Sequence, residues 1–186
     1  MIKRFIDIIL SAIGLVLLSP VFIALAIVIK RTSPGPVFYR AMRAGKNFKP
    51  FRMFKFRSMV ANADQIGGEN SPADDPRLTE VGKFMKRYKL DELPQLINVL
   101  KGEMSLVGTR PPIPDEVEHY EDWHRRRISI KPGITGLWQV SGRKEITDFS
   151  QVVKLDLKYI DNWRFRHDFW YLWKTIWAIL AGKGAK

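Results

Sequence analysis

The chain has 186 residues, which is enough for one domain with a real core and too few for two independent domains beside a membrane segment. Its 31 basic and 19 acidic residues give a net charge of +12, so we expect an anionic partner: a nucleic acid, an anionic membrane surface or a phosphorylated substrate. The absence of cysteine excludes disulfides and thiolate metal sites, and the three histidines (His119, His124 and His167) lack the spacing of a zinc pair. Nothing in this composition points away from the cytosol.

An almost wholly apolar run extends from Phe5 to Ile29 and is about as long as the roughly 20 residues that cross a bilayer. Basic pairs flank this run, Lys3-Arg4 before it and Lys30-Arg31 after it. Because basic flanks favour the cytoplasmic side, a straight spanning helix satisfies one pair, whereas a re-entrant helix hairpin satisfies both. We therefore predict that residues 1–32 form a re-entrant membrane hairpin with both ends in the cytoplasm.

Ser19 and Pro20 are the expected break in this hairpin. Pro20 has no N–H to donate to the Val16 carbonyl, and its ring displaces that carbonyl, which bends a helix. The Ser19 hydroxyl is a suitable partner for a freed carbonyl, since an unpaired one is costly in lipid. A kinked helix that spans the bilayer remains the alternative. We reject a signal peptide cleaved after residues 24–26, because the apolar run continues beyond them.

Residues 33–186 are predicted to form one small cytoplasmic domain. The predicted fold class of the chain is α+β and mainly helical. Aromatic and basic residues alternate in part over residues 37–40 and 51–57, which predicts a β-hairpin with a basic face around a turn at Gly45. Residues 61–76 are expected to form a mobile, functional loop. Helices are predicted over residues 78–88, 91–101, 115–128, 148–159 and 168–180, with an irregular stretch around residues 132–136.

The last predicted helix carries Trp170, Trp173 and Trp177 at helical spacing. Tryptophan favours the headgroup level of a bilayer, so this amphipathic helix is expected to lie flat in the membrane interface. A core helix with a seam of tryptophans is the alternative.

The most informative stretch is Leu90-Asp91-Glu92-Leu93-Pro94-Gln95, in which two adjacent acids stand among many cations. A helix that begins near Asp91 places Pro94 in the first turn, where a missing N–H costs nothing, and places both acids at the positive end of the helix dipole. Adjacent helical side chains diverge by about 100°, so at most one carboxylate faces a given ligand squarely. From these residues alone, an acidic first turn with ordinary capping value is an equally good interpretation.

This pattern suits the chemistry of a phosphorylated substrate. Lys and Arg bind phosphate oxygens, and Mg²⁺ takes one or two carboxylates together with substrate oxygens. Asp91 and Glu92 are the acids that lie within a motif flanked by such cations. Carboxylates also accept phosphoryl groups as acyl phosphates. The chain contains neither a Walker loop nor a dinucleotide-binding fingerprint.

Several further motifs accompany the acidic pair. They occupy residues 55–59 (Lys-Phe-Arg-Ser-Met), 75–79 (Asp-Pro-Arg-Leu-Thr), 81–86, 90–108, 131–136 (Lys-Pro-Gly-Ile-Thr-Gly) and 139–143 (Gln-Val-Ser-Gly-Arg). In this order, and over almost the whole chain, they resemble the bacterial sugar transferase family, the monotopic polyprenyl-phosphate phosphoglycosyl transferases. The chain is similar to the minimal catalytic form of that family.

The resemblance implies a reaction and a set of site residues. Asp91 is implied as the nucleophile that attacks the β-phosphate of a UDP-sugar and expels UMP, and polyprenyl (undecaprenyl) phosphate then takes the phospho-sugar from the aspartate. Glu92 is implied as the neighbouring acid that helps with Mg²⁺ or with proton handling, so both acids are candidate metal ligands. The cations expected to hold phosphates or the uridine end are Lys55, Arg57, Arg77, Arg110 and Arg143, although each could instead be a solvated or headgroup-binding residue.

The sequence departs from the usual family pattern at four positions. Thr109 stands where a second proline is common, which is expected to loosen the loop beside Arg110. Lys86 stands where an arginine is common, and it keeps the charge but loses bidentate geometry. Ala41 and Phe48 replace a frequent glutamine and a frequent glycine. These changes leave the acidic pair and the Ser-Pro break intact.

The resemblance also implies a location and partners. We expect a monotopic protein at the cytoplasmic face of the bacterial inner membrane, in contact with membrane lipids, with a homodimer as one possible assembly. Two rival functions are a non-enzymatic membrane adaptor, which explains the charge and the tryptophans but gives the acidic pair no role, and a membrane-tethered nucleic-acid binder based on the basic hairpin. Nucleic acid is not the partner we expect.

Overall fold

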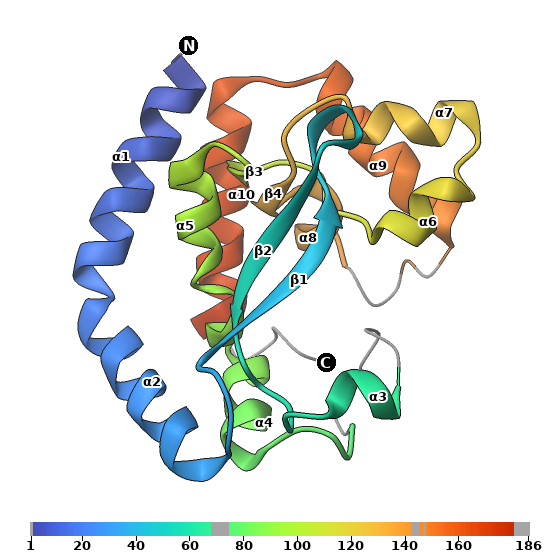
Figure 1. The fold of residues 1–186 in the computed structure, drawn as a ribbon. Coiled ribbons are helices and arrows are strands. Elements are labelled where there is room, and N and C mark those ends of the chain that lie inside the picture. The colour runs from blue at the N-terminus through green and yellow to red at the C-terminus, as the bar shows by residue number, and fades with distance from the viewer. Residues whose placement is uncertain (1, 68–74, 143–145, 147, 181–186) are drawn as a thin grey trace.

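The structure is a computed structural model that describes residues 2–67, 75–142, 146 and 148–180 (Figure 1). The helices are α1 (Ile2–Leu17), α2 (Ser19–Thr32), α3 (Ala63–Ile66), α4 (Glu80–Arg87), α5 (Gln95–Lys101), α6 (Pro114–Glu118), α7 (Asp122–Arg125), α8 (Leu137–Val140), α9 (Phe149–Asp161) and α10 (Phe165–Leu180). The strands are β1 (Phe38–Ala44), β2 (Pro50–Phe56), β3 (Ser105–Val107) and β4 (Gly133–Thr135), and the 3-10 turns are η1 (Lys46–Phe48), η2 (Leu90–Glu92) and η3 (Arg126–Ile128). The predicted α+β, mainly helical class is confirmed.

The first two helices meet at the predicted break. α1 ends at Leu17, α2 begins at Ser19, and the two helix axes bend by 59°. The Ser19 hydroxyl donates to the Val16 carbonyl at 2.8 Å, which is the carbonyl that Pro20 cannot reach with an N–H. Within the described residues, each helix taken singly is too short or too polar to cross a bilayer, whereas α1 and α2 together have the length and composition for it.

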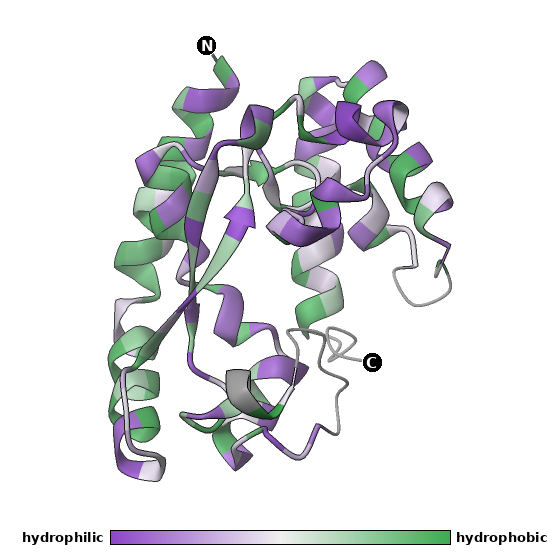
Figure 2. Ribbon diagram, turned by 45° about the vertical axis from the view of Figure 1, so that its right-hand side comes forward, coloured by the Kyte–Doolittle hydropathy of each residue, from purple (hydrophilic) through white to green (hydrophobic). Residues whose placement is uncertain are grey.

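α1 and α10 expose apolar side chains and bury polar ones. The buried residues of α1 are Asp7 and Ser11, and the buried residue of α10 is Asp168. Large apolar side chains are exposed along α1, α2 and α10, among them Phe5, Ile13, Val16, Ile23, Trp173 and Trp177. Figure 2 shows the apolar stretches that run along α1 and α2. This arrangement is the inverse of that expected for a helix that packs on a protein core and faces water.

The polar side of α1 attaches this helix to the rest of the chain. The Arg4 guanidinium donates to the Leu100 carbonyl at 2.8 Å, at the C-terminal end of α5. The Asp7 carboxylate accepts hydrogen bonds from the Ser105 hydroxyl at 2.8 Å and from the Leu106 N–H at 3.0 Å, both in β3. These contacts satisfy groups at a helix end and in a strand that would otherwise be unpaired.

The core forms where the β-hairpin meets α5. β1 and β2 pair antiparallel with Tyr39 opposite Lys55 and Arg43 opposite Phe51, which confirms the predicted hairpin. The main buried cluster joins strand, helix and loop residues: Ala41, Phe51, Met53, Leu96, Val99, Met104, Leu106, Val107 and Tyr159. The Asn98 side chain of α5 accepts from the Phe54 N–H at 2.9 Å, so α5 is also hydrogen-bonded to the edge of β2.

Two predicted helices differ from the structure. The helix predicted over 91–101 begins at Gln95, because the acids occupy the separate turn η2 and Pro94 has become the N-cap of α5. The acids therefore lie one turn ahead of α5. The helix predicted over 115–128 is divided into α6, α7 and η3, since the chain turns at Tyr120 to bury this ring in the cluster with Ala44, Val117 and Ile128.

The remaining predictions vary in outcome. Helices α4, α9 and α10 confirm three predicted helices, with side-chain caps from Thr79 for α4 and Asp148 for α9. The irregular stretch predicted near residue 133 contains β4, which pairs parallel with β3. In the expected loop over 61–76, residues 63–66 form α3 and residues 68–74 lie outside the described residues. Trp173 and Trp177 are 63% and 67% exposed, so the tryptophan core seam is wrong.

Candidate active site

The acidic pair is positioned by the tight turn η2. Lys89 precedes it in a left-handed conformation (φ 56°), which is unfavourable for a residue with a side chain and is typical of constrained functional sites. The Glu92 N–H bonds the Lys89 carbonyl at 3.2 Å, and the Leu93 N–H bonds the Leu90 carbonyl at 3.3 Å. The turn thus fixes the backbone of both acids before α5 begins.

Asp91 is a buried carboxyl group, only 6% exposed. Burial and, to a lesser extent, the charge of Glu92 raise the pKa of Asp91 to about 6, with Lys55, Lys89 and Lys86 opposing the shift. Loss of hydration is therefore the largest influence on this group, although three cations lie nearby. A carboxylate with few solvent contacts and a basic surround is well suited to react with a phosphorus centre.

Glu92 faces a different space from Asp91. Its carboxylate lies 3.4 Å from the Lys55 Nζ and 3.9 Å from the Lys89 Nζ. Asp91 lines a large cleft, whereas Glu92 lines a smaller adjoining pocket with Arg110, Gln95 and other residues. This agrees with the expectation that adjacent carboxylates diverge.

The large cleft lies along one face of the β-hairpin and encloses about 850 Å³ of space, open solvent included. Its charged lining residues are Arg43, Lys55, Arg57, Arg77, Lys86 and Asp91, so one acid faces five cations. Burial lowers the pKa of Lys86, with the charges of Lys55 and Arg77 acting in the same direction and those of Asp91 and Asp75 opposing it. The other side of the cleft is apolar, with Phe38, Phe56, Met59 and Val60.

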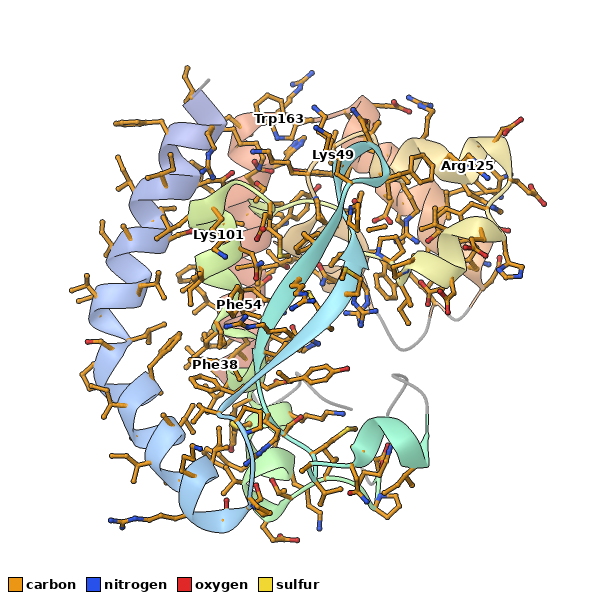
Figure 3. All side chains as sticks on the ribbon, in the orientation of Figure 1. Phe38, Lys49, Phe54, Lys101, Arg125 and Trp163 are labelled. Atoms are coloured by element: carbon orange, nitrogen blue, oxygen red, sulfur yellow. The ribbon has the colours of Figure 1, made fainter. Side chains whose placement is uncertain are left out.

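The opposite face of the hairpin carries a separate cation and aromatic stack. The Arg40 guanidinium and the Lys101 ammonium each lie 4.9 Å from the centre of the Phe54 ring. In Figure 3, which labels Phe38, Phe54 and Lys101, these side chains lie where the hairpin passes α5. The basic face predicted for the hairpin therefore divides into two sides, and only one of them borders the acidic pair.

Arg57 is strongly engaged with the backbone after α2. Its guanidinium donates to the Pro34 carbonyl at 2.7 Å and to the Ser33 carbonyl at 2.8 Å. These bonds fasten the turn between the N-terminal helices and the hairpin. The predicted phosphate role of Arg57 stays a prediction, and the contacts add a structural role to it.

Arg77 is likewise buried and bonded. It pairs with the Asp75 carboxylate at 2.7 Å and donates to the Gly67 carbonyl at 2.6 Å. These bonds hold the α3 segment against one side of the cleft. Arg77 lines the cleft, so its proposed contact with substrate also stays a prediction.

Arg110 follows a firmly held residue. The Thr109 hydroxyl donates to the Arg127 carbonyl at 2.9 Å, and the Thr109 carbonyl accepts from the Gly133 N–H at 2.8 Å. Thr109 is 1% exposed, so the expectation that it loosens this loop is wrong. Arg127 in turn pairs with the buried Asp156 at 2.7 Å, which gives the loop a rigid base.

Comparison with known proteins identifies the family of this chain. The model of the family described as bacterial sugar transferase matches residues 1–182. The chain belongs to the bacterial sugar transferase family. It is therefore a transferase, as predicted.

Three relatives illustrate how this bacterial sugar transferase compares with others. The galactosyl transferase CpsE of Streptococcus agalactiae is 47% identical over 99% of this chain and 43% of the relative. The exopolysaccharide production protein ExoY of Sinorhizobium fredii is 37% identical over 98% of this chain and 87% of the relative. The undecaprenyl-phosphate galactose phosphotransferase of Salmonella typhimurium is 42% identical over 99% of this chain and 41% of the relative. The chain thus spans less than half the length of two of them.

The structure of this sugar transferase brings most predicted site residues together. Asp91, Lys55, Arg57 and Arg77 line one cleft, Glu92 and Arg110 line the adjoining pocket, and Arg143 lies outside the described residues. Sequence analysis missed Arg43, which is buried and lines both spaces. The available signal was the alternation of the hairpin, which places Arg43 on the same face as Tyr39 and opposite the strand that carries Lys55.

The acidic pair also fits the donor set for Mg²⁺. Among the described residues, no cluster of three or more His, Asp or Glu side chains forms a metal cage. Mg²⁺ does not require one, since it takes one or two carboxylates and completes its octahedron with water and phosphate oxygens. Asp91 would supply a carboxylate in the cleft, and a further contact from Glu92, which lines the adjoining pocket, stays a prediction.

Proposed function

We propose that this transferase moves a sugar phosphate from a UDP-sugar to polyprenyl phosphate, with Asp91 as the nucleophile. The observation that carries the proposal is the buried Asp91 carboxyl group, which faces a cleft whose other charged lining residues are cations. Names of relatives agree with this class of reaction. One relative, from Escherichia coli, is named UDP-glucose:undecaprenyl-phosphate glucose-1-phosphate transferase, and another, from Aeromonas hydrophila, is named UDP-N-acetylgalactosamine-undecaprenyl-phosphate N-acetylgalactosaminephosphotransferase.

The proposed reaction has two displacement steps at one phosphorus. In the first, an Asp91 carboxylate oxygen bonds to the β-phosphorus, and the bond from this phosphorus to the bridging oxygen breaks. UMP leaves with the bridging oxygen and its electron pair, and the phospho-sugar stays on Asp91 as an acyl phosphate. In the second step, a phosphate oxygen of polyprenyl phosphate attacks the same phosphorus. The Asp91 carboxylate is released, and the product is a polyprenyl diphosphate sugar.

The surroundings of Asp91 favour the charges of this reaction. Lys55, Lys86 and Lys89 act on the Asp91 carboxyl group electrostatically, so they lie close enough to neutralise a transferring phosphoryl group. Glu92, bound by Lys55 and Lys89, holds two of these cations in place. When bound at the acidic pair, Mg²⁺ would supply further positive charge to the phosphate oxygens.

The polyprenyl acceptor is a membrane lipid, and we propose that the N-terminal helices place the cleft at the membrane surface. Helices that expose apolar residues and bury Asp7, Ser11 and Asp168 are expected where the surrounding solvent is lipid. A re-entrant α1–α2 hairpin keeps both basic flanks on the cytoplasmic side, and α10 would lie in the interface through Trp173 and Trp177. The proposed location is the cytoplasmic face of the bacterial inner membrane, as a monotopic protein.

The cleft is close to the end of this hairpin in the chain. Pro36 and Phe38 line the cleft, and they follow directly after α2, which ends at Thr32. An acceptor phosphate at the headgroup level would therefore have a short path to Asp91. The apolar lining near Phe56 and Val60 suits the first part of a prenyl chain.

The test is release of UMP by detergent-purified protein from a panel of UDP-sugars, with Mg²⁺ and undecaprenyl phosphate present. We expect release with one or a few sugars, dependence on the lipid for repeated turnover, and a single-turnover adduct on Asp91 detected by intact mass. Asp91→Asn should abolish both release and adduct. Folded protein that releases UMP from none of the sugars would contradict the proposal and favour a membrane adaptor.

A further inference from the structure

Arg43 occupies an unusual place for an arginine of a short hairpin. It lies near the end of β1, and it is only 6% exposed. Its neighbour Ala44 donates its N–H to the Pro112 carbonyl at 3.0 Å, so this end of the hairpin rests on the loop that carries Arg110. A buried guanidinium is costly unless anionic or polar groups surround it.

Two spaces meet at Arg43. The cleft on one side is lined by Asp91 and Lys55, and the pocket on the other is lined by Glu92 and Arg110. Of the described residues that line either space, Arg43 alone lines both. A group that extends from the nucleophile toward Arg110 would therefore lie within reach of this guanidinium.

A diphosphate is the part of the donor with this extended shape. Its β-phosphorus must lie beside Asp91 for the attack, and its two phosphoryl groups carry several acceptor oxygens close together. Arginine presents five donors in a planar fork, which matches phosphate oxygens two at a time and stays charged when buried. Lysine cannot reproduce this geometry, since it acts as a point charge.

We propose that Arg43 is a further catalytic residue, which binds the β-phosphoryl group of the donor at the junction of the two spaces. The proposal rests on the function proposed above and assigns a role within it. Arg43 contacts non-bridging oxygens of the phosphoryl group while this group passes from UMP to Asp91. Arg110 lies on the far side of the junction, where it can contact the remainder of the donor.

The competing explanation is that Arg43 only supports the hairpin. A structural residue would affect all nucleotides alike, whereas a β-phosphate ligand affects only nucleotides that possess this phosphate. UDP and UMP differ by that group, so their relative affinity separates the two roles. The affinity of each can be measured by titration calorimetry on the detergent-purified full chain.

The main variant is Arg43→Met, which keeps much of the side-chain length and removes the donors. We expect UDP to bind about tenfold or more weakly, as expected for losing hydrogen bonds to a charged group, while UMP affinity changes by less than about twofold. Arg40→Met is the matched control, because Arg40 is an exposed arginine of the same strand that stacks on Phe54 on the opposite face. This control should leave both affinities unchanged.

If Arg43→Met weakens the binding of UDP and UMP equally, or changes neither affinity, Arg43 does not bind the β-phosphate. The function proposed above would still stand if the wild-type protein releases UMP. A wild-type protein that neither binds UDP nor releases UMP from a UDP-sugar would overturn both. If Arg43→Met does not fold, Arg43→Lys provides the same comparison. It should weaken UDP binding relative to the wild type, because lysine keeps the charge but loses the two-point contact, and it should leave UMP binding unchanged.

Discussion

The N-terminal helices and the cleft both bury polar or charged side chains, but they do so in different surroundings. α1 leaves apolar side chains such as Phe5 and Val16 exposed and buries Asp7 and Ser11, whereas the cleft buries charged groups including Arg43 and Asp91. Each choice follows from its surroundings, since apolar side chains are stable in lipid and buried charges are stable where opposite charges or phosphates meet them. The exposure of a side chain therefore does not by itself show whether it is favourable. That depends on whether the surface contacts water, lipid or a ligand.

The two regions are joined through α5 and its neighbouring strand. Arg4 bonds the C-terminal end of α5, and Asp7 bonds β3, while the acidic pair immediately precedes the N-terminal end of α5. A short, rigid element thus separates the proposed membrane anchor from the nucleophile. This arrangement would hold Asp91 at a fixed height above the bilayer.

The largest effect is expected in the charged cleft, at the proposed nucleophile. Asp91→Asn keeps the size of the side chain but removes the nucleophilic carboxylate, so turnover should fall by about a thousandfold or more. UMP release and the melting temperature of the same preparation measure the result. Asp122→Asn, on the exposed first turn of α7, is the control and should keep full activity. A near-normal rate for Asp91→Asn would exclude the covalent mechanism.

The second-largest effect is expected in the apolar N-terminal helices α1 and α2. Pro20→Ala restores an N–H for the Val16 carbonyl, so α1 and α2 should straighten into one helix that spans the bilayer. A reporter fused to the N-terminus should then move from the cytoplasmic to the opposite side of the membrane. Labelling of cysteines introduced at both ends of the fused protein measures on which side each end lies. Ser19→Ala is the control, because it removes one hydrogen bond and leaves the proline in place. A reporter that stays cytoplasmic in Pro20→Ala would show that the proline does not set the topology.

A third test uses the buried ion pair behind the Arg110 loop. Burial raises the pKa of Asp156 to about 6, although Arg127 opposes the shift. Because this folded-state pKa lies above the ordinary value of 3.8, the folded protein retains a proton that the unfolded chain releases. The resulting stabilisation is complete below about pH 4 and is lost as the pH rises through about 6.

Melting temperatures measured between about pH 4 and pH 7 test this dependence. Asp156→Asn cannot titrate, so its melting temperature should change less with pH than that of the wild type over the same interval. The slope is compared instead of the absolute stability, since the substitution also leaves Arg127 without its carboxylate. Parallel curves for the two proteins would refute the assignment.

The smallest effect is expected at the tryptophans of α10. Trp173→Gln and Trp177→Gln each remove an exposed aromatic ring that we place in the membrane interface, so each should weaken vesicle binding by about fivefold to tenfold. Flotation at limiting lipid concentration measures the affinity. Trp123 lies on α7, so the control variant Trp123→Gln should leave vesicle binding unchanged. Unchanged binding of both α10 variants would place α10 away from the membrane.

Local physical rules made part of this structure predictable. The break at Pro20 follows from a missing N–H, the hairpin from side-chain alternation, and α4 and α9 from the helical pattern of their residues. The divergence of Asp91 and Glu92 follows from the geometry of adjacent residues in a helical turn. The sequence motifs also located the acidic pair and the cations near it. The break at Pro20 and the divergence of the two acids depend on residues within about one turn of one another.

The use of each side chain was decided by tertiary contacts. Arg57 and Arg77 carry the same charge as Lys55, but their guanidinium groups bond backbone carbonyls from segments that local patterns do not identify. Arg43 belongs to no quoted motif, and only the meeting of two spaces at its side chain marks it. β3 and β4 are three residues each, too short for a periodic signal, and they exist because they pair with each other. Sequence by itself thus determined where the chain bends and which residues are chemically capable, whereas long-range packing decided which of them face the cleft, because burial and orientation depend on partners distant in the chain.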